Sequence, residues 1–118
     1  SYPGLKKPGS KSDAVVETVD LFPTLCELTG LPVPAFAHGT SLKAQLDDPN
    51  ADGHEAVGYH SRYQTIRSAA FRLTLHNDGF IELYNHQATE KETLNVADRL
   101  PSIRDRLKAR LLEKRSQP

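Results

Sequence analysis

The stretch FRLTLHNDGFIELYN, residues 71–85, has the pattern of a β-hairpin. In its first half, apolar and polar residues alternate, as in a strand with one buried face and one solvated face. Asp78-Gly79 then separates the two halves, and Asp-Gly between alternating apolar residues is the strongest short hairpin signal. The stretch therefore predicts two antiparallel strands that are joined by a tight turn.

Two further segments before this hairpin, 55–60 and 63–68, also have the composition of short strands. After the hairpin, apolar residues recur at helical spacing. They are Leu100, Ile103, Leu107 and Leu111. We therefore expect an α+β fold, in which a small antiparallel sheet of three to four strands is covered on its apolar face by a C-terminal helix from about Asp98 to Arg115.

The segment VDLFPTLCELTGLPVP, residues 19–34, predicts a short helix despite its internal proline. Proline disrupts a helix interior, but the N–H groups of the first turn have no acceptor within the helix. A helix that begins with Asp20 as N-cap places Pro23 in that turn, and Gly30 ends it. The preceding residues 14–19 have the composition of a short strand.

This strand–helix segment carries more apolar side chains than one small sheet can cover. They are Val15, Val16, Val19, Leu21, Phe22, Leu25 and Leu28. We therefore expect residues 1–45 to be the end of a larger α/β domain, and residues 46–118 to form a C-terminal subdomain with the sheet and the helix. The absence of methionine and the Gly-, Pro- and Lys-rich start also indicate a piece of a longer or processed protein.

The composition argues against several classes of function. Fifteen basic and 15 acidic side chains give a formal net charge of zero, whereas a general nucleic-acid surface needs clustered positive charge. The single cysteine, Cys26, allows neither an internal disulfide nor a zinc site made of cysteines. No run approaches the ~18 apolar residues of a membrane span. We expect neither a nucleic-acid partner nor a membrane partner.

No motif specifies a reaction from spacing alone. The five histidines lack the spacing of a metal site, and the acidic stretch 47–52 does not match a calcium loop. Cys26 lies between Leu25 and Leu28, so we expect it to pack in an interior rather than to react. Neither a nucleophile elbow nor a phosphate-binding loop is present in the sequence.

Three arginines of the predicted sheet region are candidates for contacts with an anion. Arg62, Arg67 and Arg72 lie near Tyr59 and Tyr63 in the sequence. Guanidinium groups pair well with sulfate, phosphate or carboxylate. The alternative, and the more common case, is that such arginines lie on a solvated sheet face or in local ion pairs.

Four segments, in order, resemble motifs of the type I sulfatases of the alkaline phosphatase superfamily. VVETVDLFPTLCELTGLPVP (15–34) is similar to V-x-x-V/I-D-L-x-P-T-L-x-x-L-A-G-L/I-x-x-P, and HGTSLKAQLDDP (38–49) to G-x-S-L-x-P-L-L-x-D-P. YQTIRSAAFRLTLH (63–76) is similar to x-S-I-R-T-x-x-Y-R-Y, and ELYNHQATEKETLNVAD (82–98) to E-L-Y-D-L-x-x-D-P-x-E-x-x-N-L-A. The first segment is most similar to the iduronate-2-sulfatase-like and choline-sulfatase-like branches.

The resemblance implies the C-terminal part of an enzyme that hydrolyses a sulfate ester, for example of a sulfated sugar. The family's formylglycine arises in a C/S-x-P-x-R motif upstream of these segments. Cys26 does not match it, because Leu28 and Gly30 stand where the proline and arginine belong. We therefore expect no catalytic residue, metal ligand or cofactor in this chain, and no activity from it alone. Calcium and formylglycine are expected in the full enzyme.

The resemblance also implies partners and peripheral contacts. In this family the C-terminal subdomain packs on the large domain and borders the mouth of the pocket. The implied substrate-binding residues are His60, Arg62 and Tyr63, whereas Arg67, the family arginine of S-I-R-T, is expected to hold the strand pair to the large domain. Many relatives are exported, so an exported or periplasmic parent protein is one expectation.

Two rival hypotheses come from other classes of protein. The first is a free-standing module that binds an anionic saccharide through Arg62, Arg67 and Arg72. The second is a domain without catalytic function whose role is packing.

Overall fold

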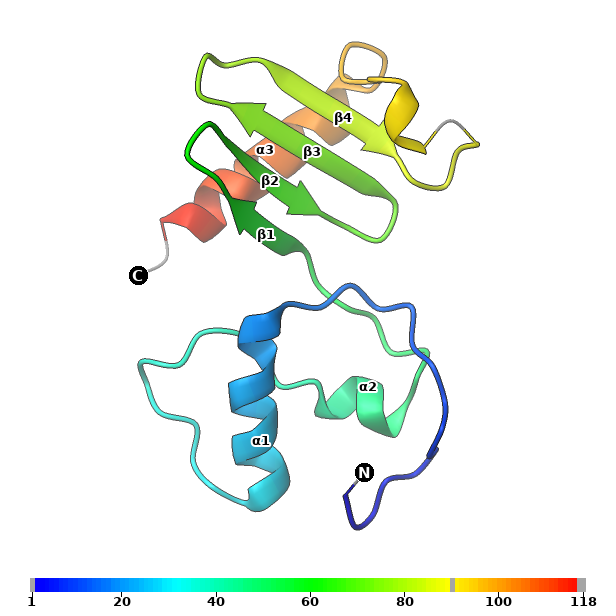
Figure 1. The fold of residues 1–118 in the computed structure, drawn as a ribbon, viewed down its shortest axis with the longest axis vertical. Coiled ribbons are helices and arrows are strands. Elements are labelled where there is room, and N and C mark those ends of the chain that lie inside the picture. The colour runs from blue at the N-terminus through cyan, green and yellow to red at the C-terminus, as the bar shows by residue number, and fades with distance from the viewer. Residues whose placement is uncertain (1, 90, 117–118) are drawn as a thin grey trace. The chain divides into compact units, whose positions relative to one another are not determined.

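The computed structural model describes residues 2–89 and 91–116. Within these residues the chain forms two compact units, which divide between His54 and Glu55 (Figure 1). In the described part of the chain, no helix is long and apolar enough to cross a membrane. The predicted domains, 1–45 and 46–118, refer to a larger protein and stay predictions.

Helix α1, Leu21–Thr29, follows a single 3-10 turn, η1, at Thr18–Asp20. Pro23 is the third residue of α1, among the positions whose N–H groups have no acceptor within the helix. Gly30 ends the helix with a φ of 72°, a left-handed conformation that a residue without Cβ adopts readily. The predicted helix is therefore confirmed, with its proline in the first turn.

Two predictions about the start of the N-terminal unit are wrong. The predicted strand at 14–19 is not formed in the described structure, where these residues are irregular until η1 begins. Asp20 is not the side-chain cap of α1, because its carboxylate accepts no N–H group of that helix among the described residues. Instead, Asp20 Oδ2 accepts from the backbone N–H of Glu17 at 2.7 Å. The carboxylate reaches back along the chain and closes the 3-10 turn.

The Asp20 carboxylate is fully buried and joins distant segments of the N-terminal unit. Besides the Glu17 N–H group, it accepts from the Thr40 backbone N–H at 2.8 Å and lies 2.7 Å from His54 Nε2. Burial raises the pKa of Asp20. The hydrogen bonds from Thr40, Glu17 and His54 outweigh this effect, so that the pKa lies below its ordinary value.

A side chain of α1 also holds this loop. The Thr24 hydroxyl oxygen accepts from the Leu42 backbone N–H at 2.8 Å, just before the short helix α2, Lys43–Asp47. The loop approaches η1 so closely that a Cβ on Gly39, whose φ is 91°, would lie 2.6 Å from the carbonyl oxygen of Val19. Glycine at this position therefore permits the contact.

The C-terminal unit contains a four-stranded antiparallel sheet in its described residues, in the order β1-β2-β3-β4. The strands are β1 (Ala56–Tyr59), β2 (Tyr63–Arg67), β3 (Phe71–His76) and β4 (Ile81–Asn85). Helix α3, Pro101–Arg115, crosses one face of this sheet (Figure 1). The predicted α+β fold, with a small sheet covered by a C-terminal helix, is confirmed.

The turn between β3 and β4 contains the predicted Asp78-Gly79 pair. Gly79 has a φ of 89°, and the Asp78 carboxylate accepts from the Phe80 backbone N–H at 2.9 Å. A turn with these properties fixes the register of the two strands. In that register Leu73 lies opposite Leu83, so both leucines face the core.

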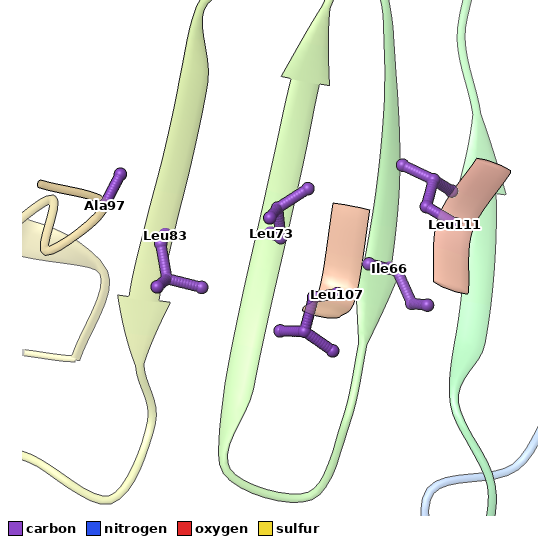
Figure 2. Packing of buried hydrophobic residues seen from close by; sticks show 6 residues of the cluster. All are labelled: Ile66, Leu73, Leu83, Ala97, Leu107 and Leu111. Carbon is purple, nitrogen blue, oxygen red and sulfur yellow. The ribbon is translucent and has the colours of Figure 1, made fainter. Parts of the chain in front are cut away.

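The core of the C-terminal unit begins with a row of three apolar side chains across the sheet. Ile66, Leu73 and Leu83 are partners on neighbouring strands, and each is 0% exposed. Leu107 and Leu111, one turn apart on α3, cover this row and are 1% and 0% exposed (Figure 2). Burial of these apolar side chains holds the helix on the sheet.

Helix α3 begins later than the sequence predicts. A 3-10 turn, η2, lies at Lys91–Thr93, but α3 starts at Pro101 rather than at Asp98. The residue before a proline disfavours helical torsion angles, and Leu100 accordingly has φ −127° and ψ 62°. Proline is itself well suited to the first helical position. The predicted start at about Asp98 is therefore three residues too early.

We predict that Leu107→Ala lowers the free energy of unfolding by about 2–5 kcal/mol, the usual cost of truncating a buried leucine. The matched control is Leu112→Ala on the same helix, where the leucine is 39% exposed and the loss is expected to be much smaller. Urea unfolding followed by circular dichroism measures both variants. Equal losses would contradict the core described here.

We predict that Asp20→Asn destabilises the N-terminal unit at pH 7 by about 1–3 kcal/mol, since a buried charged acceptor is lost. The folded-state pKa of Asp20 is lowered. Its contribution to the free energy of unfolding is therefore fully present above the unfolded pKa of about 3.9, and it disappears as pH falls through the folded-state pKa. The difference from wild type should therefore shrink below about pH 4.

Exchange of the Thr40 amide proton measures this effect, because that N–H donates to Asp20. The control is Asp52→Asn, at an exposed aspartate of the same unit. A difference between Asp20→Asn and wild type that stays constant from pH 7 to pH 3 would show that the carboxylate charge plays no part.

Candidate functional site

The face of the sheet opposite α3 carries polar and aromatic side chains. Successive side chains of a strand point to opposite faces, so the neighbours of Ile66, Leu73 and Leu83 point away from the core. We call this surface the polar face. It comprises Tyr63, Thr65, Arg67, Arg72, Thr74, His76, Glu82 and Tyr84.

The structure brings together two of the three predicted substrate-binding residues. His60, in the β1–β2 turn, stacks on Tyr63 with ring centroids 4.7 Å apart and an interplanar angle of 19°. The turn is closed by the His60 N–H group, which donates to the Tyr63 carbonyl oxygen at 2.9 Å. Arg62 is exposed at the tip of this turn, and its backbone N–H donates to His60 Nδ1 at 3.3 Å.

The stacked pair continues into a longer row of rings. The Tyr63 ring lies 5.8 Å from that of His76, its partner on β3, and His76 lies 5.6 Å from Phe80. Tyr63 is 38% exposed and Phe80 is 56% exposed. We call His60, Tyr63, His76 and Phe80 the ring row. It offers a partly exposed aromatic surface at one end of the sheet.

A carboxylate on β4 fixes the middle of the ring row. Glu82 Oε2 lies 2.6 Å from His76 Nε2, and the Tyr84 hydroxyl donates to Glu82 Oε1 at 2.7 Å. The hydrogen bonds from His76 and then from Tyr84 lower the pKa of Glu82, and the Glu82 carboxylate raises the pKa of Tyr84. Glu82 is therefore ionised at neutral pH and holds the His76 ring in place.

The three candidate arginines do not form one cluster. Arg62 and Arg67 lie at opposite ends of β2, five residues apart along an extended chain, roughly 17 Å. Arg67 and Arg72, in contrast, are directly opposite each other on β2 and β3. The polar face thus has two separate ends, one with the ring row and Arg62, the other with the pair Arg67 and Arg72.

One cluster of the N-terminal unit has the composition of a cation site. Ligand atoms of Glu17, Asp20 and His54 all lie within 4.8 Å of one another. However, Asp20 already accepts from two backbone N–H groups and lies at hydrogen-bond distance from His54. Calcium prefers oxygen ligands and needs six to eight of them. These residues therefore fit a structural hydrogen-bond cluster better than a calcium site.

Cys26 is placed as the sequence predicts. Its side chain is 7% exposed in the N-terminal unit, where it packs rather than faces solvent. With Leu28 and Gly30 at the positions of the motif's proline and arginine, it does not fit a formylglycine precursor. We assign it no chemical role.

The sequence interpretation missed His76 and Phe80 as neighbours of the candidate site. Both belong to the β3–β4 hairpin, and their proximity to Tyr63 follows from the pairing of Tyr63 with His76. A tight turn sets the register of neighbouring strands, so a marked turn between β2 and β3 would have predicted this pairing. The turn between β2 and β3, at Ala69 and Ala70, carries no such marker.

Comparisons with known proteins place the chain in a wider context. It is 33% identical over 110 residues to an N-acetylglucosamine-6-O-sulfatase of Bacteroides thetaiotaomicron, an alignment that covers 80% of this chain and 20% of that protein. It is 32% identical over 108 residues to a Delta 4,5-hexuronate-2-O-sulfatase of the same organism, covering 80% of this chain and 22% of the relative. A sulfatase of Formosa agariphila is 31% identical over 98 residues, which cover 81% of this chain and 19% of that protein.

Two solved structures also match most of this chain. A protein in complex with its substrate, D-glucosamine-2-N,6-O-disulfate, matches with a TM-score of 0.79 and 29% identity, over 96% of this chain and 26% of that chain. A 2-O GAG sulfatase matches with a TM-score of 0.74 and 25% identity, and the match covers 95% of this chain and 27% of that chain. No protein-family model matches the chain.

The chain spans about a fifth of the length of the sulfatases that it matches in sequence. A match to so short a segment is consistent with the C-terminal part that the sequence motifs predict. The resemblance to the sulfatases is confirmed by both kinds of comparison. The chain is therefore related to the sulfatases and matches about a fifth of their length.

Proposed function

We propose that this chain is the C-terminal portion of a sulfatase that hydrolyses sulfate esters of a sugar. The observation that carries the proposal is the match to the structure bound to D-glucosamine-2-N,6-O-disulfate, which extends over 96% of this chain and so includes both of its units. The iduronate-2-sulfatase-like or choline-sulfatase-like branch, suggested by residues 15–34, is part of the proposal. The activity itself would belong to the whole protein.

The N-terminal unit supports a role as part of a larger core. Leu21, Phe22 and Leu25 of α1 are 54%, 47% and 60% exposed, and Leu31 and Phe36 after the helix are 62% and 76% exposed. Large exposed apolar patches mark interaction surfaces, and covering them contributes about 25 cal/mol per Å². We propose that the large domain of the parent enzyme covers this surface.

The ring row supports a role beside the substrate pocket. Stacked aromatic rings give a flat surface suited to the apolar face of a ligand, and binding sites combine such surfaces with a few polar groups. Arg62 is an exposed residue of the β1–β2 turn, and a guanidinium group suits the oxygens of a sulfate group. In the proposal, His60, Arg62 and Tyr63 contact the sugar that carries the sulfate ester.

The chemistry of sulfate hydrolysis is not assigned to residues of this chain. Neither Cys26 nor the cluster Glu17, Asp20 and His54 fits the formylglycine and calcium that the family resemblance implies. In the full enzyme those groups would supply the nucleophile and orient the sulfate. The residues described here would bind and orient the sugar.

The rival hypothesis of a free-standing saccharide-binding module is less well supported. It requires Arg62, Arg67 and Arg72 to act together, but Arg62 lies at the other end of β2 from the other two. The parent-enzyme proposal needs no such cluster, because it uses only the end of the polar face that carries the ring row.

We expect the product of the whole gene to hydrolyse sulfate esters and the 118-residue chain alone to be inactive. In the whole enzyme, Arg62→Ala and Tyr63→Ala should each raise KM for the preferred sulfated sugar by roughly tenfold with a smaller change in kcat, as for the loss of about 1.4 kcal/mol of binding. A panel of sulfated sugars and choline sulfate identifies that substrate.

The matched control is Arg106→Ala, which removes an exposed arginine from α3 and should leave both constants unchanged. A gene that encodes no C/S-x-P-x-R motif upstream of these residues, or a whole product without sulfatase activity, would contradict the enzyme proposal. An active enzyme whose KM is insensitive to both substitutions would contradict only the assignment of the binding residues.

A further inference from the structure

At the end of the polar face away from the ring row, two positive charges are held next to each other. Arg67 and Arg72 are partners on β2 and β3, so their side chains leave the same face side by side. Like charges directly opposite each other destabilise a sheet. The pair lies beside the β2–β3 turn, where the Ser68 N–H group donates to the Phe71 carbonyl oxygen at 2.8 Å. The close spacing of the arginines is thus imposed by the backbone.

Each of these arginines has a buried nitrogen without a partner. Arg67 Nη1 and Arg72 Nε are inaccessible to solvent, and neither has a hydrogen-bond acceptor within residues 2–89 and 91–116. A buried N–H group without an acceptor is costly, the more so on a charged group. Burial and the charge of Arg72 both lower the pKa of Arg67, although a guanidinium stays protonated.

A single carboxylate, that of Glu92, supplies negative charge near both arginines. Glu92 Oε1 lies 2.8 Å from Arg72 Nη1, and the same oxygen lies 2.8 Å from His86 Nε2. This single carboxylate is thus shared by Arg72 and His86, and no ion pair is formed by Arg67 in the described structure. Among the described residues, two guanidinium groups and one carboxylate leave an excess positive charge at this place.

We propose that Arg67 and Arg72 form a binding site for one tetrahedral oxyanion, such as a sulfate group. Since Arg67 Nη1 and Arg72 Nε are closed to solvent, the anion would accept from the other nitrogens of the two guanidinium groups and offset their mutual repulsion. The site is roughly 17 Å along β2 from Arg62, so it is separate from the substrate contacts proposed above. It does not depend on those contacts or on enzymatic activity. It would give the protein a second point of attachment for a multiply sulfated ligand.

The test is a titration of the folded chain with sodium sulfate, with sodium chloride at equal ionic strength as reference. The Nε–Hε resonances of Arg67 and Arg72 are followed by NMR. We expect saturable shifts of both resonances with sulfate and with inorganic phosphate, and at least tenfold weaker binding of acetate. Absence of saturable shifts with sulfate, or equal binding of acetate, would overturn the proposal.

Variants separate this site from general attraction by positive charge. Arg67→Gln and Arg72→Gln should each weaken sulfate binding at least tenfold, whereas Arg106→Gln, with the same loss of charge on exposed α3, should leave it unchanged. Arg67→Lys keeps the charge but loses the planar fork, and should bind less tightly than wild type. Equal loss in Arg67→Gln and Arg106→Gln would overturn the site.

A stability measurement distinguishes an anion site from a merely structural arginine. Because Arg67 forms no ion pair with the residues that the structure describes, Arg67→Gln should unfold at the same urea concentration as wild type, or at a higher one, in chloride buffer. Sulfate should then raise the midpoint of wild type by more than that of the variant, because sulfate also stabilises folded proteins without binding a specific site. A lower midpoint of Arg67→Gln in chloride would identify a packing role and overturn the proposal. None of these measurements involves catalysis, so their failure leaves the sulfatase proposal intact.

Discussion

The packing of α3 on the sheet is the interaction on which the C-terminal unit depends. Leu107 and Leu111 close over the row formed by Ile66, Leu73 and Leu83, and these five side chains are almost completely removed from solvent. That core presents one face of the sheet to the helix and leaves the opposite face to polar and aromatic side chains. The polar face can therefore serve binding, since it is not needed for the core.

The N-terminal unit is stabilised in a different way. Its most buried side chains include Asp20 and Thr24, which bind backbone groups of the 40–42 loop, while Leu21 and Leu25 of α1 are more than half exposed. Hydrogen bonds give this unit its shape, but its apolar face contributes little burial. A large partner surface would complete it, as expected for a segment that covers only about a fifth of its relatives.

The elements that were predicted correctly are those that have a local signal in the sequence. The strands of the sheet and the α1 helix were found because alternation, Asp78-Gly79 and Gly30 are local signals. The start of α3 was misplaced because Pro101 suits the first helical position better than the one assumed. The role of Asp20 was missed because Thr40 and His54 are 20 and 34 residues away, and no periodicity reports such contacts. The ring row likewise depends on pairing between strands.

The most direct test of this account is hydrogen–deuterium exchange of the 118-residue chain, followed at each amide. The account predicts that amides of β2, β3 and α3 exchange slowest, because they surround the closed core. Amides of α1 should exchange much faster, since the exposed face of that helix lacks a covering surface. Protection of residues 21–29 equal to that of β3 would show that the N-terminal unit is stable alone, and would contradict the claim that it belongs to a larger core.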